Sequence, residues 1–390
     1  MVIYKFRNIF EIFPVKVINV GSLSQFMKGL INLLPSENIL SSAALRALAH
    51  VDQAQYHLPT AGYSVMPARA KLHELFQQVD ASTKSFFRVT CADTQPLSGM
   101  HAMHIVLQGL RSSHSELFSL SRQLGGHSNT GPMASHLGYS YRSIPDWSSI
   151  SDLPSRGPSR VFYLDHAVVI EPYDFSKLLT SIRPNDTLVY DISHLALFWP
   201  TYDVPHDERL LICGSFHKSF PGPQKAFFGS IINSDRFDEI KRFADIAVSS
   251  RHTGAMMALN VSLNEMISSA QDYRDTIKEL TSACARSVEK FTPVGRTSDG
   301  AYTHSHQLWI HCPEWERVTV SAAQVGVVVY RSFLPAFNQY GLRIGLQSIG
   351  RTKKSPMAAS LIGEGLGNLI CGDELRAKIF FDEARGILYD

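Results

Sequence analysis

A lysine held in a tight turn between two apolar segments is the feature of this sequence that most clearly points to chemistry. Residues 210–230 read LLICGSFHKSFPGPQKAFFGS, in which a β-rich run leads to Lys218, a turn rich in proline and glycine, and a second β-rich run. A lysine that forms a Schiff base must be held rigidly in a partly desolvated pocket, so that its neutral amine is available and its direction is fixed. Most lysines are exposed loop residues, and without further signals Lys218 would be interpreted as one of them.

A carboxylate that follows another β-rich run supplies such a signal. Asp191 comes directly after Thr187–Tyr190 and begins the sequence Asp-Ile-Ser-His, which closes with His194. The cofactor pyridoxal 5′-phosphate (PLP) acts as an electron sink only while its ring nitrogen is protonated, and a carboxylate beside that nitrogen keeps it protonated. An aspartate at a strand end is otherwise a helix cap or a turn residue. Because the lysine motif favours the cofactor role, we predict that Lys218 and Asp191 bind PLP.

The elements that must position these residues are predicted to form a mostly parallel sheet. The middle of the chain alternates β-rich runs with helical patterns, which is typical of an α/β sheet covered on both faces. Ligands of such sheets collect at the carboxyl ends of the strands. Two strands end in polar clusters there, one with Asp191 and His194 and the other with Ser215, His217 and Lys218. The expected elements are strands at Arg160–Leu164, Thr187–Tyr190, Leu210–Cys213, Ala226–Ile232, Gln307–His311 and Val327–Tyr330, and a long helix at Ala255–Lys290.

Length and composition favour a two-domain protein that acts on a small molecule. The chain has 390 residues, of which 44% are apolar and 18% are charged, and it is long for a single core. We expect a domain boundary near residues 285–295. The 37 basic and 35 acidic residues are spread along the chain and leave a net charge of only +2, so no basic face for nucleic acid is expected.

Cysteine usage argues against a disulfide framework and against a zinc site. The five cysteines are far apart, odd in number and never in a Cys-x-x-Cys pair, which suits a reducing cytoplasm. The histidine pairs His101/His104 and His304/His306 lack the cysteine or carboxylate that would complete a convincing metal site. The cysteines are Cys91, Cys213, Cys284, Cys312 and Cys371.

The first twenty residues are apolar enough to suggest a signal peptide, but charged residues interrupt them. Lys5, Arg7, Glu11 and Lys16 break any continuous hydrophobic region, so we predict an ordered arm there. No other stretch approaches the roughly 20 apolar residues that a membrane-spanning helix requires. We therefore expect a soluble protein without membrane contact.

Taken in order, the motifs of the chain resemble those of serine hydroxymethyltransferases. The pair Asp-x-x-His at 191–194 and His-Lys-x-x-x-Gly-Pro at 217–223 is similar to the family pattern, in which the aspartate meets the pyridine nitrogen and the lysine forms the internal aldimine. Further matches in family order are Leu34-Pro35-Ser36-Glu37-Asn38, Pro96-Leu97-Ser98-Gly99, Gly125-Gly126-His127 and Gly341-Leu342-Arg343-Ile344-Gly345.

This resemblance implies the fold and the domain organisation. The expected fold is the α/β PLP-dependent transferase fold type I, with a mostly parallel sheet in the large domain and a smaller α+β C-terminal domain. The N-terminal segment would cover residues 1–40, the PLP-binding large domain 41–288, and the small domain 289–390. The family builds its sites across a subunit interface, so a homodimer is expected.

Roles for individual residues follow from the same resemblance. Ser98, Gly99 and Met100, which precede a predicted helical run at 101–110, would bind the cofactor phosphate through free N–H groups and the helix dipole. His127 would stack on the cofactor ring, although a histidine is more often a satisfied core or surface residue. Thr253 lies in a loop that would reach the phosphate of a neighbouring subunit.

The remaining roles concern the substrate. Arg343 would grip the amino-acid carboxylate with its bidentate guanidinium, and so select the Cα bond that breaks. Ser36 would assist at that carboxylate and His194 at the phenolic oxygen of the cofactor. Tyr56 would take part in catalysis and in substrate binding.

One departure from the hydroxymethyltransferase pattern bears on the reaction. Folate-dependent members carry a glutamate between two tyrosines, whereas this chain reads Gln55-Tyr56-His57-Leu58-Pro59 and then Ala61-Gly62-Tyr63-Ser64. A carboxylate that handles protons cannot be lost without loss of its step. The segments Tyr56-His57, Gly222–Lys225, Thr303–Gln307 and Gly345-Leu346-Gln347 instead resemble the L-threonine transaldolases.

The resemblance therefore implies a PLP enzyme that cleaves the Cα–Cβ bond of threonine or serine through a glycyl quinonoid, as an aldolase or transaldolase of amino-acid or secondary metabolism. Its partners would be an amino acid and an aldehyde. Alternatives are a folate-dependent serine/glycine hydroxymethyltransferase, or a racemase, transaminase or decarboxylase with the same cofactor residues. A PLP-binding subunit without activity is disfavoured because it would need neither Lys218, Asp191 nor Arg343.

Overall fold

The computed structural model describes residues 29–56, 67–144, 150 and 153–389. The predicted arm at residues 1–20 lies outside the described residues, as do His57, Leu58, Pro59 and the motif 61–64. Among the helices of the described part, none is both long and apolar enough to cross a membrane.

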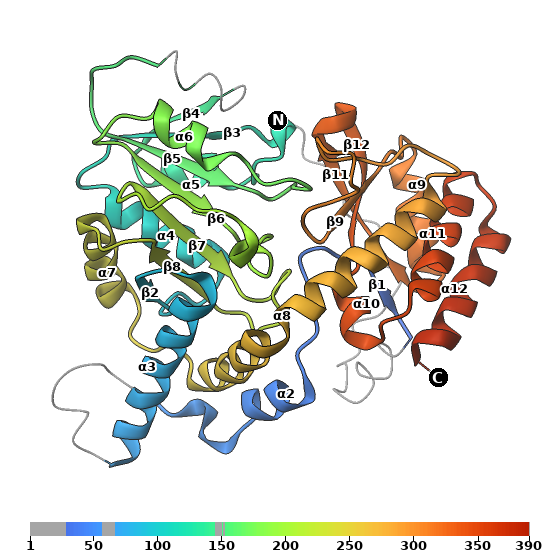
Figure 1. Ribbon diagram of the computed structural model, residues 1–390, viewed down its shortest axis with the longest axis horizontal. Coiled ribbons are helices and arrows are strands. Elements are labelled where there is room, and N and C mark those ends of the chain that lie inside the picture. Colours follow the sequence, from blue (N-terminus) through green and yellow to red (C-terminus); the bar gives the residue numbers. More distant parts are fainter. Residues whose placement is uncertain (1–28, 57–66, 145–149, 151–152, 390) are drawn as a thin grey trace, which may run out of the picture.

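A seven-stranded sheet forms the larger lobe (Figure 1). Its strand order is β2-β8-β7-β6-β5-β3-β4, and β8 runs opposite to the other strands of this sheet. The strands β5, β7 and β8 are buried along their whole length, as expected for a sheet covered on both faces. The strands are β2 (Cys91–Asp93), β3 (Glu116–Leu120), β4 (Ser140–Ile144), β5 (Arg160–Asp165), β6 (Thr187–Asp191), β7 (Leu210–Ser215) and β8 (Ala226–Ser230).

Helices cover both faces of this sheet because successive strand residues point to opposite sides. Val161 and Tyr163 of β5 pack with α4 (Gly99–Leu110) and α7 (Asp235–Ala247). Phe162 and Leu164 of the same strand belong to the core formed with α3 (Pro67–Phe87) and α8 (Thr253–Val288). Shorter elements of this lobe are α2 (Ser42–Leu48), η2 (Val51–Ala54), η3 (Arg122–Leu124), α5 (Thr130–His136), α6 (Phe175–Ser181) and η5 (Trp199–Thr201).

A second core lies in the smaller lobe, and α8 reaches from one lobe to the other (Figure 1). An antiparallel sheet of order β11-β12-β9 packs there with helices of the C-terminal part, and β1 pairs in parallel with β10. The elements are β1 (Ile31–Asn32), β9 (Gln307–Ile310), α9 (Trp315–Gln324), β10 (Val327–Val328), β11 (Tyr330–Leu334), η6 (Pro335–Phe337), β12 (Gln339–Gly345), α10 (Gln347–Thr352), α11 (Pro356–Ile370) and α12 (Glu374–Tyr389). The domain division at residues 40 and 288 stays a proposal.

The structure confirms the long helix and the predicted strands apart from that at 327–330, with their ends shifted by a few residues. One expectation is wrong. Gly99 and Met100 do not precede the helix after Ser98 but form its first turn, because the Ser98 hydroxyl caps α4 by accepting the N–H of His101 at 3.2 Å. The predicted strand at 327–330 is divided between β10 and β11.

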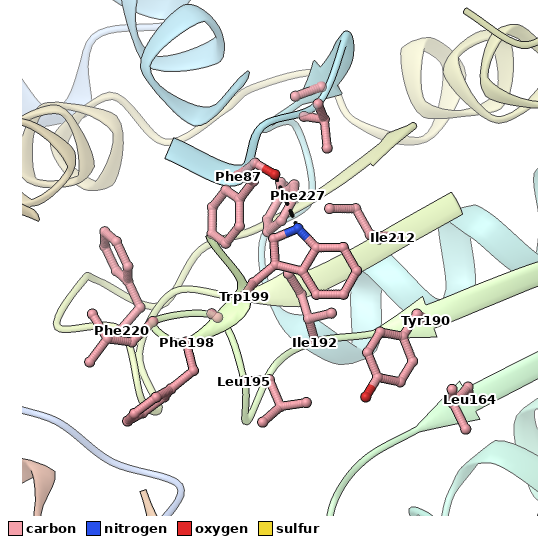
Figure 2. Close-up of a cluster of buried hydrophobic side chains, with 14 of the residues drawn as sticks. Phe87, Leu164, Tyr190, Ile192, Leu195, Phe198, Trp199, Ile212, Phe220 and Phe227 are labelled. Atoms are coloured by element: carbon pink, nitrogen blue, oxygen red, sulfur yellow. Dashed lines mark hydrogen bonds between the residues drawn. The ribbon is translucent and has the colours of Figure 1, made fainter. Parts of the chain in front are cut away.

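Aromatic packing anchors the turn that carries Lys218, and Figure 2 shows the buried cluster to which Phe220 and Phe227 belong. Phe216 and Phe220, on either side of the lysine, are fully buried, and Phe216 packs against Phe227 with 5.2 Å between ring centroids. The indole N–H of Trp199 donates to the carbonyl oxygen of Phe87 at 3.0 Å in the same cluster. The direction of the lysine is thus set by the core of the larger lobe.

A close backbone approach completes that turn. The N–H of Gly222 donates to the carbonyl oxygen of Phe216 at 2.7 Å. A Cβ at residue 222 would lie 2.8 Å from the same oxygen, so only glycine fits without a shift of the backbone. The proline- and glycine-rich sequence after Lys218 is therefore required by the shape of the turn.

Candidate active site

Lys218 lies at the carboxyl end of the sheet, just beyond β7, and is partly buried. Burial lowers the pKa of its amine; the charge of Asp191 opposes this shift and that of Arg343 adds to it. A larger share of the amine is therefore neutral at neutral pH than for an exposed lysine. This is the form that a nucleophilic lysine requires.

Asp191 lies on the neighbouring strand β6, where its Cα pairs with that of Cys213 on β7. Its Oδ2 accepts the hydroxyl of Tyr163 at 3.0 Å, and its Oδ1 accepts the N–H of Ser193 at 2.9 Å. Both contacts suit a carboxylate, which only accepts hydrogen bonds. Asp191 is thus held rigidly beside the lysine with two donors directed at it.

The end of β7 and the start of α4 form a cradle with unused donors. The Ser215 hydroxyl is buried without a partner among the described residues, and within the same part of the chain no acceptor is recorded for the N–H groups of Gly99 and Met100. A Cβ at residue 99 would lie 3.4 Å from the Cβ of Ser215 and fill the space between the two elements. A helix N-terminus with orphan N–H groups and a free hydroxyl fits a phosphate group, so these residues fit PLP.

Neutral imidazole rings surround the same space. Burial lowers the pKa of the partly buried His127, Lys218 lowers it further, and Asp191 opposes the shift. His194 stacks in parallel on His306, with 5.5 Å between ring centroids and 7° between planes. Burial takes the pKa of His194 well below its ordinary value and that of His306 to about 3. All three rings are therefore neutral at neutral pH.

His306 ties the smaller lobe to the N-terminal part of the site. Its Nε2 donates to the carbonyl oxygen of Pro35 at 2.8 Å, which assigns the hydrogen to that nitrogen. Its Nδ1 is buried and has no partner within the described residues. Ser36 follows Pro35 directly and is partly buried, so the structure brings its segment beside the histidine stack.

Arg343 on β12 is a buried cation that has no counter-ion among the described residues. Its Nη1 donates to the carbonyl oxygen of Ala167, and its Nε has no partner in the described part of the chain. Burial lowers its pKa to about 10, and Tyr330, whose ring centroid lies 5.4 Å away, is the opposing influence. The guanidinium remains charged at neutral pH, and no carboxylate of the described residues pairs with it. A buried cation of this kind favours an anionic ligand.

Tyr56 and Thr253 occupy a different position. Tyr56 is 40% exposed, and Thr253, at the start of α8, donates its hydroxyl to the carbonyl oxygen of Gln55 at 2.6 Å. The predicted roles of these two residues stay predictions.

Two further residues of the site were not singled out from the sequence. Asp165 is the last residue of β5 and pairs with Asp191, and Tyr163 lies two residues before it on the same strand. The polar Asp165-His166 pair at the end of an apolar run was the sequence signal that could have found Asp165. His306 lay in a quoted motif, but its stack with His194 depends on the approach of the two lobes, which no local pattern shows. His217, whose pKa burial lowers to about 4, lies beside Lys218 with its Nδ1 buried and unpaired among the described residues.

Comparison with known proteins places this geometry among PLP-dependent enzymes. No family model matches the chain. The L-threonine:uridine-5′-aldehyde transaldolase of a Streptomyces species is 27% identical over 374 residues, which cover 88% of this chain and 85% of that protein. The serine hydroxymethyltransferase of Methanobrevibacter smithii is 26% identical over 362 residues, covering 84% and 83%.

A solved structure shows the fold. The L-threonine transaldolase of Pseudomonas fluorescens, in its internal aldimine state, superimposes with a TM-score of 0.81 and 19% identity over 93% of this chain and 89% of that one. The expected α/β fold type I is therefore confirmed. The sequence relatives confirm the predicted resemblance to serine hydroxymethyltransferases and L-threonine transaldolases, and with it the predicted class of PLP-dependent enzyme.

Proposed function

We propose that the chain is a PLP-dependent aldolase or transaldolase, which cleaves the Cα–Cβ bond of a β-hydroxy amino acid and joins the glycine unit to an aldehyde. The observation that carries the proposal is the convergence of Lys218, whose amine has a lowered pKa, the hydrogen-bonded Asp191 and Arg343, which has no counter-ion among the described residues. The similarity to transaldolases supports threonine as the donor.

The residues that would hold the cofactor divide into three groups. Ser98, Ser215 and the N–H groups of Gly99 and Met100 would bind the phosphate. Asp191 would face the ring nitrogen, His127 the face of the ring, and Lys218 the reactive carbon. His194 would lie at the phenolic oxygen, and His217 would border the lysine. When bound, PLP supplies a protonated ring that accepts the electron pair released at the substrate Cα.

Substrate orientation is the proposed task of Arg343. Its planar guanidinium can accept a carboxylate in a bidentate manner, and the nearby Ser36 hydroxyl would add a third donor. Because the guanidinium is buried, it has little contact with water, and the carboxylate of a bound amino acid would supply the opposite charge that it lacks. Fixing the carboxylate fixes the rotation about the Cα–N bond and so the bond that breaks.

Cleavage of threonine also requires removal of the proton from the β-hydroxyl oxygen. The Lys218 amine, whose pKa burial lowers, and the neutral imidazoles of His127 and His194 are proton acceptors at the site. Tyr56, from the segment in which folate-dependent relatives carry their glutamate, would contribute to such a site across the proposed subunit interface. These side chains could therefore accept the proton of the β-hydroxyl group although the glutamate of the folate-dependent relatives is missing.

The reaction should not need tetrahydrofolate. We expect purified enzyme to release acetaldehyde from threonine at the same rate with and without tetrahydrofolate, because the carboxylate that serves one-carbon transfer is absent. The measurement is acetaldehyde release with a coupled alcohol dehydrogenase, with serine as the parallel donor. Serine turnover that strictly requires tetrahydrofolate would restore the hydroxymethyltransferase alternative, which the relatives also support.

Substitution of Arg343 should weaken substrate binding while PLP stays bound. We expect Arg343→Ala and Arg343→Lys to raise the KM for threonine roughly tenfold to a hundredfold, since a hydrogen bond to a charged group contributes about 1.5–3 kcal/mol and lysine cannot supply the bidentate geometry. Cofactor content by absorbance is the second readout. Arg331→Lys on the adjacent strand β11, whose side chain stacks on Trp315 at 4.3 Å, is the matched control and should change neither value. Normal threonine binding in the Arg343 variants would mean that another group holds the carboxylate.

We also propose a homodimer that works in the cytoplasm, in amino-acid or secondary metabolism. Large apolar side chains are exposed on the segment around α2 and η2, where Val51 is 90% and Leu45 is 50% exposed. Such surfaces favour a protein contact, and a partner subunit there would lie beside Tyr56 and Thr253. All five cysteines are free, which supports a reducing compartment.

A further inference from the structure

A buried carboxyl group beside the proposed cofactor site has no role in the function above. Asp165 ends β5, is 2% exposed, and its Cα pairs in register with that of Asp191 on β6. Paired residues of neighbouring strands point to the same face of a sheet. Two carboxyl groups therefore lie next to each other at the carboxyl end of the sheet.

Asp165 is buried without a cation to balance a charge, as far as the described residues show. Thr130 at the start of α5 donates its hydroxyl to Oδ2, and the N–H of the same Thr130 donates to the carbonyl oxygen of His127 at 3.3 Å. Its Oδ1 is buried with no partner among the described residues. No lysine or arginine of the described part forms an ion pair with it, whereas the equally buried Asp186 pairs with both Arg160 and Arg183 at 2.8 Å.

Electrostatics separates the two neighbouring carboxyl groups. A buried carboxyl without a cation, placed beside another carboxylate, favours its protonated form. Asp191 is less buried than Asp165, and each of its oxygens accepts a hydrogen bond, whereas Oδ1 of Asp165 accepts none from the described residues. Asp191 is therefore the member of the pair that keeps the charge. Asp165 is left with the proton and with the contacts that hold the segment of His127.

We propose that Asp165 is a positioning residue that stays a neutral carboxylic acid, fixes the turn that carries His127 and leaves Asp191 as the only anion at the ring nitrogen. This role rests on the proposed PLP function, because a fixed His127 and a single anion at Asp191 matter only if the cofactor ring binds between them. The state of the carboxyl group itself can be measured without cofactor or substrate.

The pH dependence of stability follows from this state. Burial raises the pKa of Asp165 well above its usual range, the charge of Asp191 adds to this, and the hydrogen bonds from Thr130 and His127 act against it. Tyr163 on β5 and Cys213 on β7, which also face the carboxyl pair, are themselves shifted towards their neutral forms. In the unfolded chain Asp165 ionises near pH 4. The unfolded state therefore loses its proton first, and the native state loses stability as the pH rises from about 4 towards the folded pKa.

Asp165→Asn in the cofactor-free protein tests the neutral state. Asparagine keeps an oxygen acceptor for Thr130 and cannot ionise. Relative to this variant, the folding equilibrium constant of wild type should fall by up to about tenfold per pH unit above pH 4, measured by urea unfolding at pH 5, 6, 7 and 8. Asp186→Asn is the matched control. Burial acts to raise the pKa of Asp186, but Arg183 and Arg160 lower it. Above about pH 4, Asp186→Asn should therefore be less stable than wild type, the opposite sign to Asp165→Asn.

The positioning role needs a second readout in the holoenzyme. Asp165→Asn should retain the cofactor spectrum and keep kcat within about threefold of wild type, whereas Asp165→Ala should lower kcat more than it raises KM, because His127 loses its support. A constant stability difference between wild type and Asp165→Asn across pH 5–8 would show an unshifted pKa and overturn the proposal. Equal kcat values in Asp165→Asn and Asp165→Ala would also overturn the proposal. If Asp165→Ala does not fold, a large loss of kcat in Asp165→Asn would overturn it instead. If the protein does not bind PLP but its stability depends on pH as expected, the proposed function is rejected. The neutral state of Asp165 is then still supported.

Discussion

Replacing Lys218 by alanine should lower kcat by more than about a thousandfold, the largest effect that we expect from any single substitution. The proposed roles of its amine include both attachment of the cofactor and proton transfer, and general acid–base contributions alone reach about 10²- to 10⁴-fold. The turn should survive the change because Phe216 and Phe220 anchor it. Measurement of kcat with threonine, together with cofactor content after dialysis, checks the expectation.

Peptide mapping after borohydride reduction distinguishes Lys218 from the other buried lysine nearby. Burial lowers the pKa of Lys225 to about 7, but its Nζ donates to the carbonyl oxygens of Gln95 and Arg251 at 3.3 and 3.1 Å. We expect the pyridoxyl group on Lys218 in wild type and in Lys225→Met. An adduct on Lys225, or none on either lysine, would contradict the assignment.

Substitution of Asp191 by asparagine should lower kcat roughly a hundredfold to a thousandfold in a protein that still folds and binds PLP. The amide has nearly the same shape but no charge, and removal of one partner of a buried charge pair costs about 3–5 kcal/mol. The ring nitrogen would lose its proton, and the electron sink would weaken. Steady-state turnover and the cofactor absorbance as a function of pH are the measurements.

Two variants on β5 serve as controls for Asp191. Tyr163→Phe removes one donor to the carboxylate and should produce a smaller loss, since a single hydrogen bond to a charged group contributes about 1.5–3 kcal/mol. Asp165→Asn should produce almost none. Near-normal turnover in a folded, PLP-loaded Asp191→Asn protein would give Asp191 another role.

The central part of this site could be predicted from the sequence because its residues follow strands directly. Asp191 and Lys218 each come just after an apolar run, and neighbouring parallel strands bring their carboxyl ends to the same edge of a sheet. The cap of α4 was misplaced because Ser98 is followed by Gly99, which has low helix propensity, and the side-chain contact to His101 that fixes the start is not visible in a pattern.

The residues that sequence reasoning missed depend on register and on the approach of the two lobes. Asp165 becomes significant only once its Cα is paired with that of Asp191. His306 reaches the site, beside the predicted Arg343, because β9 and β12 of the smaller lobe pair with each other and lie against the loop after β5. Long-range contacts of this kind have no local signal. The predicted roles of Tyr56 and Thr253 would require a site that the proposed partner subunit helps to form.

Carbon transfer from labelled threonine tests the proposed function most directly. The enzyme is incubated with threonine that carries ¹³C at Cα, benzaldehyde as the acceptor and no tetrahydrofolate, and the products are identified by NMR. We expect acetaldehyde to form together with a new β-hydroxy amino acid, derived from benzaldehyde, that carries the label at Cα, or with labelled glycine if protonation is faster than capture. Retention of all label in threonine, with alanine or aspartate turned over without Cα–Cβ cleavage, would contradict the proposal.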